Sequence, residues 1–340
     1  MTQTAPAPAT AEELTRQPQT PAKRLHDVLH RFPALSPLIV LVLAAIVFGI
    51  ANERFFKPEN LSIIFQQTAV VGSLAVGQTL IILTAGIDLS IGAVMVLSTL
   101  VMAKLVSENH VPGFVAFLVG FVIAVVAETI NGLLVTRIKL PPFIVTLGTL
   151  SIFTAMTLIY AQGQVITLDK GFLVWTGNTI GGGGFNITTG VLLMLLLYAG
   201  FAYALRQTAW GRHLYATGDD VEAARLAGIR TNRVLLSAYV VCGAVVGLTA
   251  WIQIGRINGA DPNAAINLNL ESITAVVIGG TSLFGGRGVI VGSLIGALIV
   301  QVFTNGLALA GVDPNYQVLA VGILVIVAVA ADQWIRSVKS

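Results

Sequence analysis

The stretch LSIIFQQTAVVGSLAVGQTLIILTAGIDLSIGAVMVLSTLVMAKLV, residues 61–106, decides the fold class. It consists of two apolar arms, 61–83 and 88–106, and its only charged side chains are Asp88 and Lys104. A helix that spans the hydrocarbon core of a bilayer needs about 20 mostly apolar residues. Each arm has about that length, so the stretch predicts two membrane-spanning helices separated by a short Gly-containing break.

The composition of the whole chain agrees with a membrane protein. Of 340 residues, 55% are hydrophobic and 10% are charged, and the mean hydropathy is +0.86. Soluble domains carry about 25% charged residues, so these charges are too few to build a water-facing surface. The composition therefore excludes a soluble enzyme, a nucleic-acid-binding protein and a disordered protein.

The length criterion predicts an all-α integral membrane fold with about ten transmembrane helices. They are expected at 35–51, 61–83, 88–106, 112–135, 143–160, 189–205, 234–254, 270–284, 288–309 and 316–335. In the pair 270–284 and 288–309, as in the pair 61–83 and 88–106, a Gly-rich break interrupts the apolar run.

The remaining segments predict the domain organisation. Residues 1–34, rich in Pro, Thr and Ala without an apolar stretch, are expected to be a disordered cytoplasmic tail. Residues 35–335 form one membrane domain, and 336–340 form a cytoplasmic end. The segment 161–188, which contains Gly181 to Gly184, is expected to be a flexible extracytoplasmic loop.

The distribution of basic residues orients this topology. With ten crossings and a cytoplasmic N-terminus, 14 of the 19 Lys and Arg residues fall on inner segments. The five on outer segments are Arg54, Lys57, Lys104, Lys170 and Arg256. An excess of Lys and Arg in cytoplasmic loops is the rule for membrane proteins, so both termini are expected in the cytoplasm.

Small residues recur at helical spacing in two of the predicted helices. Gly288, Gly292 and Gly296 form one ladder, and Gly243 and Gly247 form another. Because lipid provides no hydrophobic drive between helices, such ladders favour close backbone packing.

Motifs for catalysis and metal binding are absent from the sequence. The chain has no P-loop, no G-x-S-x-G elbow and no Cys/His cluster with metal-ligand spacing. The single Cys242 lies in an apolar run and is interpreted as core filler, and the HDVLH segment with His26 and His30 lacks a third ligand. No catalytic residue, no metal and no cofactor of this chain's own is therefore expected.

The most charged segment is RQTAWGRHLYATGDDVEAARLAGIRTNR, residues 206–233. Asp219 or Asp220 suits the cap of a short helix, Glu222 suits its positively polarised first turn, and Gly228 suits its end. A short helix with small apolar residues at the inner surface of a membrane is suited to docking in the groove of another protein.

Five phrases in the chain resemble the membrane subunits of ATP-binding-cassette (ABC) sugar importers of the ribose type. They are TAGIDLSIGA (84–93), NGLLVTRIKLPPFIVTLGT (131–149), GxxxxAARLAGI (218–229), SITAVVIGGTSLFGGRG (272–288) and GSLIGALIV (292–300). The resemblance covers about residues 35–335. It implies the ten-helix permease fold of the vitamin B12 importer class (type II), in the bacterial inner membrane.

The resemblance also implies partners and a coupling helix. The permease would work as a dimer, with itself or a paralogous permease, beside a cytoplasmic ATPase with two P-loop domains that binds ATP and Mg. An extracytoplasmic binding protein would deliver a monosaccharide such as ribose or fructose. The coupling helix would comprise Gly218, Asp219, Asp220, Glu222, Ala224, Arg225, Ala227 and Gly228. Many members have Asn where this chain has Asp219, which makes the site more acidic here.

A path for a neutral sugar needs hydrogen-bonding groups within the apolar spans. Candidates are Gln67, Gln78, Asp88, Glu128, Asn131, Thr149, Glu271, Thr274 and Asn305. Carboxylates inside a membrane are costly and indicate function by default. However, Asp88 and Glu271 also lie at predicted helix starts, where they suit capping of backbone N–H groups.

Three other functions are compatible with a polytopic membrane protein. One is an ABC permease for another small polar solute: a polyol, a nucleoside or a furanosyl signal molecule. A second is an ion-coupled transporter, which is disfavoured because no His lies in a predicted span. The third is an enzyme acting on a lipid-linked sugar, which would need paired carboxylates at a membrane face. Within 35–335 the only adjacent acidic pair is Asp219 and Asp220, and it fits the coupling helix better.

Overall fold

The computed structural model describes residues 35–264 and 267–337, so the predicted tail with His26 and His30 lies outside the described residues. Each of the ten predicted segments contains a helix. Six of these helices are long and apolar enough to cross a membrane: α4 (Pro58–Leu83), α6 (Gly113–Thr136), α7 (Pro142–Ala161), α8 (Thr189–Gln207), α11 (Thr231–Ile257) and α13 (Ile290–Leu309). The other four are apolar over shorter lengths: α3 (Leu35–Ala51), α5 (Ile91–Ser107), α12 (Leu268–Ile278) and α14 (Pro314–Ser337).

Helix α4 lies at the centre of the bundle. Helices α8, α11, α12 and α13 all pack against it, and nearly all of its residues from Thr68 to Leu83 are buried. The outer helices α3, α6, α7 and α8 instead expose large apolar side chains, such as Ile50, Ile159 and Leu196. Exposed apolar faces of this size are expected where a protein contacts lipid.

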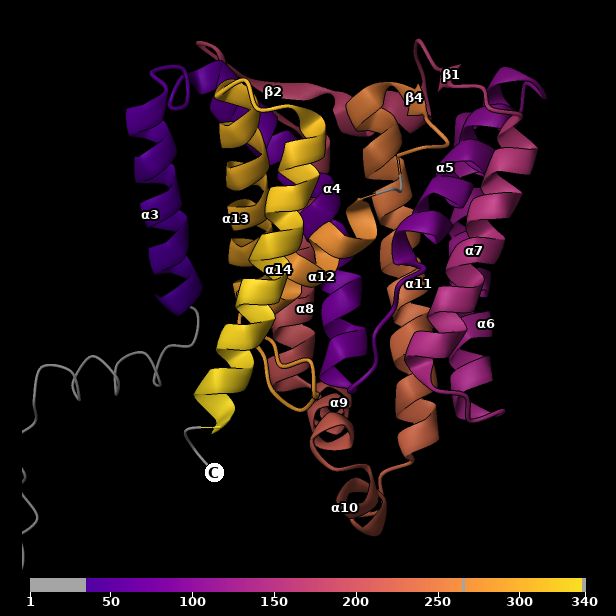
Figure 1. Ribbon diagram of the computed structural model, residues 1–340. Coiled ribbons are helices and arrows are strands. Elements are labelled where there is room, and N and C mark those ends of the chain that lie inside the picture. The colour runs from indigo at the N-terminus through magenta and orange to yellow at the C-terminus, as the bar shows by residue number, and fades with distance from the viewer. Residues whose placement is uncertain (1–34, 265–266, 338–340) are drawn as a thin grey trace, which may run out of the picture.

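Two helices of the bundle are interrupted. Figure 1 shows that α5 and α12 do not extend to the end of the molecule at which α9 and α10 lie; the segments 84–90 and 279–289 cover the remaining distance. The prediction of a helix over 270–284 was wrong at its end, because α12 stops at Ile278. Gly280 there has a φ of 85°, a left-handed conformation that ends a helix at little cost for glycine.

The glycine ladders make close helix contacts, as predicted. A Cβ on Gly292 or Gly296 of α13 would overlap backbone oxygens of α12, and one on Gly243 of α11 would press on Val125 of α6. Gly288, however, precedes α13 and has a φ of 156°. It therefore belongs to the break and not to the ladder.

Small strands occupy the end of the molecule opposite to α10 (Figure 1). Strand β1 (Ile166–Thr167) pairs with β4 (Gly259–Ala260), β2 (Thr179–Gly182) forms a hairpin with β3 (Phe185–Thr188), and η1 (Phe172–Gly177) is a 3₁₀ helix. The segment 161–188, expected as a flexible loop, therefore contains regular hydrogen-bonded structure. Gly183 and Gly184 at the hairpin turn have positive φ values, so they allow the tight turn that the hairpin needs.

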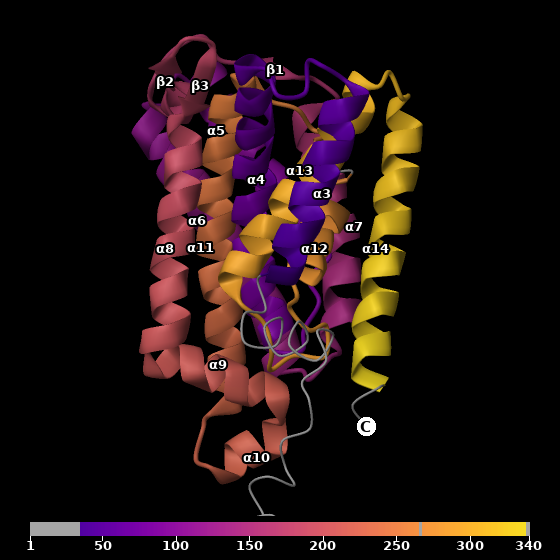
Figure 2. The same cartoon turned by 90° about the vertical axis from the view of Figure 1, so that its left-hand side faces the viewer.

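Two short helices, α9 (Ala209–Asp219) and α10 (Val221–Leu226), project beyond the bundle between α8 and α11. Figure 2 shows them at the same end of the molecule as the C-terminal end of α14. The charged segment 206–233 thus forms a separate arm, which we call the α9–α10 arm.

Candidate functional site

Helix α9 has a side-chain cap at its start and attaches the α9–α10 arm to the bundle through two side-chain hydrogen bonds. The Thr208 hydroxyl caps α9 by accepting from the N–H of Gly211 at 3.2 Å. The indole N–H of Trp210 donates to Ser237 of α11 at 2.8 Å, and the Tyr215 hydroxyl donates to the carbonyl of Gly288 at 2.9 Å. Burial raises the pKa of Tyr215 above its usual value, so the hydroxyl stays protonated and remains a donor.

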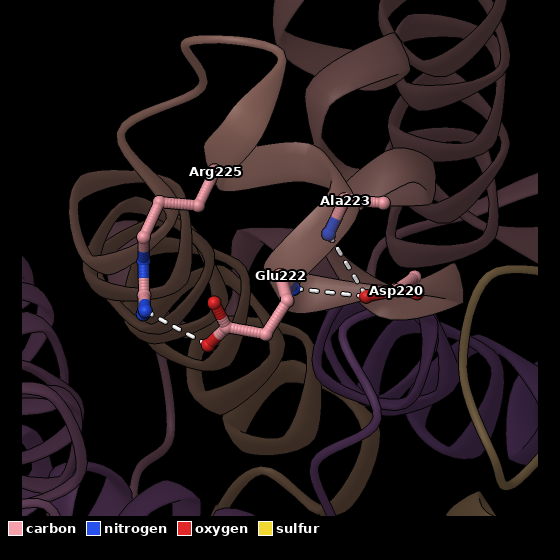
Figure 3. A network of polar contacts seen from close by, with 4 residues as sticks. All are labelled: Asp220, Glu222, Ala223 and Arg225. Atoms are coloured by element: carbon pink, nitrogen blue, oxygen red, sulfur yellow. Dashed lines mark hydrogen bonds and ion pairs between the residues drawn. The ribbon is translucent and has the colours of Figure 1, made fainter.

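Helix α10 begins at Asp220 and ends before Gly228. A carboxylate oxygen of Asp220 accepts from the N–H groups of Glu222 at 2.9 Å and Ala223 at 3.0 Å, which resolves the alternative between Asp219 and Asp220 (Figure 3). Gly228 has a φ of 84° and follows the last turn. Both ends of α10 are therefore specified by its own residues.

The charged residues of α10 point away from the bundle. Arg225 donates to Glu222 at 2.8 Å (Figure 3), and both side chains are exposed. Leu226 has 90% of its surface exposed, whereas Ala224 is buried against the rest of the chain. The outward surface of α10 therefore consists of Val221, Ala223, Leu226 and the Glu222–Arg225 pair, and it continues into Ala227.

The α9–α10 arm meets the end of α4 and the 279–289 break at one point, which we call the glycine junction. It consists of Gly218 of α9, Leu83 at the end of α4, and Gly285 with Gly286 in the break. The N–H of Gly286 donates to the Leu83 carbonyl at 3.0 Å. A Cβ on Gly218 would overlap that same carbonyl, and a Cβ on Gly285 would press on Gly218. Three backbones therefore touch with no side chain between them.

A cleft of about 470 Å³ lies beside the arm, between α9 and the start of α11. Its lining includes Trp210, His213, Gly228, Arg230 and Arg233. Arg230 and Arg233 are exposed, so the cleft presents positive charge next to the outward surface of α10.

Three of the predicted path residues lie on α12 and α13. The Glu271 carboxylate accepts from Gln301 at 3.1 Å and caps no backbone N–H, unlike one of the expectations. It borders a cavity of about 130 Å³ between α12, α13 and α14, lined also by Asn267, Thr304 and Gln317. Thr274 is buried and donates to its own helix, and Asn305 exchanges two hydrogen bonds with Asn60 of α4 at 2.9 and 3.0 Å.

Three further path candidates form a fully buried cluster away from that cavity. Asp88 in the 84–90 break accepts from the backbone and hydroxyl of Ser90, just before α5. On α6, Asn131 donates to Ser90 at 2.9 Å and to Glu128 at 3.1 Å. Asp88 thus holds the turn that leads into α5, as its position at a helix start suggested.

The last three candidates have other surroundings. Gln78 is fully buried in α4 and its side-chain amide has no hydrogen-bond partner, while Gln67 is half-buried in the same helix. Thr149 of α7 donates to the Val145 carbonyl of its own helix at 3.1 Å. The nine path candidates therefore do not line one continuous surface of this chain.

Several residues that the sequence did not single out belong to these sites. Tyr215 and Gly286 join the arm to the second break, and Leu226 forms the exposed tip of α10. Leu226 could have been found, because a large apolar residue between charged ones on a short helix is a recognisable signal for docking. The contacts of Tyr215 and Gly286 join residues far apart in the chain and leave no local pattern.

Comparison with known proteins identifies a family. Residues 60–329 match the model of the branched-chain amino acid transport system / permease component family. No solved structure matches.

Among individual proteins, similar chains are named as sugar permeases. The chain is 47% identical to the fructose import permease protein of Rhizobium meliloti, over 95% of this chain and 91% of that protein. It is 38% identical to the ribose import permease protein of Bacillus subtilis, over 94% and 98%. It is 33% identical to the D-allose transport system permease protein of Escherichia coli, over 87% and 88%.

Proposed function

The chain belongs to the branched-chain amino acid transport system / permease component family, and from this premise we propose that it forms the route by which a monosaccharide enters a bacterial cell. It is a subunit of an ABC importer and not an enzyme. The similarity to the fructose permease over nearly the full length of both chains carries the proposal for the substrate class. Ribose and fructose are the sugars that we propose first, since their permeases are the first two relatives described above.

We propose ten passes through the inner membrane, with both termini and the α9–α10 arm in the cytoplasm. The six long helices, the four shorter apolar ones and the two breaks provide enough length for this number. The excess of Lys and Arg at the end that carries the arm supports the orientation.

The outward surface of α10 is our proposed docking site for the ATPase subunit, which would bind ATP and Mg. Leu226 is exposed to water in this chain. Its burial in an apolar groove of a partner would stabilise the complex by about 1.5–3 kcal/mol. The Glu222–Arg225 pair and the basic cleft next to it would orient the partner through charge.

The glycine junction is the proposed route by which motion of the ATPase reaches the membrane. Packed backbones have little freedom to slide past one another, so a displacement of α9 would move Leu83 and Gly286 together. Leu83 directly precedes the break that leads to α5, and Gly286 lies within the break that follows α12. The same push would therefore act on both interrupted helices at once.

The sugar path is proposed to run past α12, where Glu271, Gln317 and Asn267 offer hydrogen-bonding groups beside a small cavity. That cavity is about 130 Å³, which is below the 300–1,000 Å³ of typical ligand pockets. We therefore propose that a second permease, this chain or a paralogue, completes the path. The mixed charges at the opposite end, Arg54, Lys57, Glu59, Lys170, Arg256 and Asp261, would orient the binding protein.

Uptake measurements test the proposal. In a strain from which only this chain is deleted, uptake of radiolabelled fructose, ribose, xylose and allose is measured before and after the gene is restored. We expect ATP-dependent uptake of at least one of these sugars to disappear and return, while uptake of proline does not change. If uptake of every monosaccharide is unaffected by the deletion, the chain does not carry sugar.

A further inference from the structure

One group of side chains suited to metal binding lies in the described part of the chain and takes no part in the proposed transport route. It consists of Asp88 from the 84–90 break, Glu128 from α6 and Cys242 from α11. One ligand atom from each residue lies within 4.8 Å of the others, and all three side chains are fully buried. We call this group, with its neighbours, the Asp88 cluster.

Hydrogen-bond acceptors outnumber donors in the Asp88 cluster. One oxygen of Asp88 accepts from Ser90 at 2.7 and 2.8 Å, and one oxygen of Glu128 accepts from Asn131 at 3.1 Å. The other oxygen of each carboxylate, Asp88 Oδ2 and Glu128 Oε1, accepts no hydrogen bond from a residue outside this pair. The two carboxyl groups also lie within hydrogen-bonding distance of each other, so a proton or a cation must lie between them.

Two neutral oxygen atoms beside the carboxylates also lack partners. The Asn131 amide lies against the cluster, because its Nδ2 contacts Glu128, and its buried Oδ1 accepts from no donor. The Tyr239 hydroxyl is buried without a partner and lies beside Gly86 of the same break. A buried oxygen without a partner costs about 1–3 kcal/mol, and a cation among these oxygens would remove part of that cost.

No basic side chain in the described part of the chain supplies the missing charge. Across residues 35–264 and 267–337, the two ion pairs are Lys104–Glu108 and Glu222–Arg225, and neither involves the cluster. Two unpaired carboxylates in the interior of a membrane protein would be strongly unfavourable.

We propose that the Asp88 cluster binds one divalent metal ion, and that Zn²⁺ fits it best. On binding, the Cys242 thiol would release its proton, so that the thiolate and one carboxylate balance the charge of the divalent ion while the proton shared by the two carboxyl groups remains. Carboxylate oxygen and Cys sulfur are both zinc ligands, whereas a sulfur donor disfavours Mg²⁺ and Ca²⁺. Asn131 Oδ1, which is buried without a donor beside Glu128, is our proposed fourth ligand.

The ion would join three parts of the fold. Its ligands come from the 84–90 break, α6 and α11, so it would fix the turn into α5 relative to the two helices that pack most extensively on each other. This role does not depend on which solute the chain carries.

Metal analysis of the purified full-length chain in nanodiscs tests the site. The protein is stripped with a chelator, incubated with ZnCl₂, washed and analysed by inductively coupled plasma mass spectrometry. We expect about one Zn²⁺ per chain, and a higher melting temperature with Zn²⁺ than without it. Co²⁺ used in the same way should give a sulfur-to-cobalt absorption band in the near ultraviolet.

Variants locate the ion. Asp88→Asn and Glu128→Gln should each weaken Zn²⁺ binding by about 100-fold, since removal of a ligand is expected to cost at least as much as removal of a residue that supports one. Cys242→Ser, which is nearly isosteric, should abolish the Co²⁺ band, and the control Glu271→Gln should bind as the wild type does. Absence of Zn²⁺ binding by the wild type would overturn the proposal and leave a shared proton as the bridge. Binding that survives in Asp88→Asn and Cys242→Ser would overturn it too, because the ion would lie elsewhere.

Discussion

At the scale of single residues, the neighbouring aspartates Asp219 and Asp220 have different structural roles. Asp220 caps α10 with two hydrogen bonds, whereas the backbone of Asp219 packs on Gly286 in the glycine junction. Aspartate is a favourable cap residue, so both positions could begin a helix. Only the backbone conformation determines which of the two is the cap. Asp220 has a φ of −152° and a ψ of 110°, the extended geometry typical of a cap.

We predict that Asp220→Ala destabilises the first turn of α10 by about 1 kcal/mol, because two N–H groups lose their acceptor. Hydrogen exchange of the amides at 222 and 223 should speed up by about fivefold for a loss of that size. Asp220→Asn keeps the acceptor oxygen and should retain most of the protection. Asp219→Ala is the matched control, and an equal effect of this control would refute the assignment of the cap.

At the scale of elements, the contact between the α9–α10 arm and the two breaks depends on the absence of side chains. Gly218 belongs to α9, where alanine would by itself favour the helix by about 1 kcal/mol. If Gly218→Ala loses function, the cause is therefore the lost contact with Leu83 and not a weaker helix α9.

We predict that Gly218→Ala uncouples transport. A Cβ at this position overlaps the Leu83 carbonyl, so α9 must move away from the junction. In proteoliposomes containing the complete importer, we expect sugar uptake to fall at least tenfold on an order-of-magnitude estimate, while ATP hydrolysis continues. The control is Gly200→Ala in α8, where nothing lies within 4 Å of the new Cβ. Wild-type uptake by Gly218→Ala would show that the junction does not transmit motion.

At the scale of the whole molecule, the α9–α10 arm and the hairpin of β2 and β3 mark opposite ends of the bundle (Figures 1 and 2). The chain has one cysteine, Cys242, which is fully buried. Introduced cysteines can therefore be labelled against a low background, and the orientation in the membrane can be measured directly.

We predict that a membrane-impermeant maleimide labels Lys170→Cys but not Leu226→Cys on intact spheroplasts. Both positions are exposed, and α8 lies between them in the chain. Permeabilisation should allow Leu226→Cys to react as well. Labelling of Leu226→Cys alone would invert the proposed orientation, and labelling of both on intact cells would show that α8 does not cross.

The sequence by itself determined the features that depend on residues close together in the chain. The apolar lengths predict the helices, the glycines at 279–280 and 285–286 predict a break, and Gly228 predicts the end of α10. These features follow from local hydrophobicity and backbone freedom, which few residues specify. The five family phrases likewise predicted the permease family that the comparisons then showed.

Tertiary structure alone decided which of these elements meet. Asp88, Glu128 and Cys242 are far apart in the chain and have no metal-ligand spacing, yet the 84–90 break and two helices bring them to one point. Gly218, Leu83 and Gly286 come together in the same way. For the same reason six of the nine polar path candidates separated into a group on α12 and α13 and a buried group around α6, and the other three lie on α4 and α7. Contacts between distant residues depend on how helices pack side by side, which local composition does not specify.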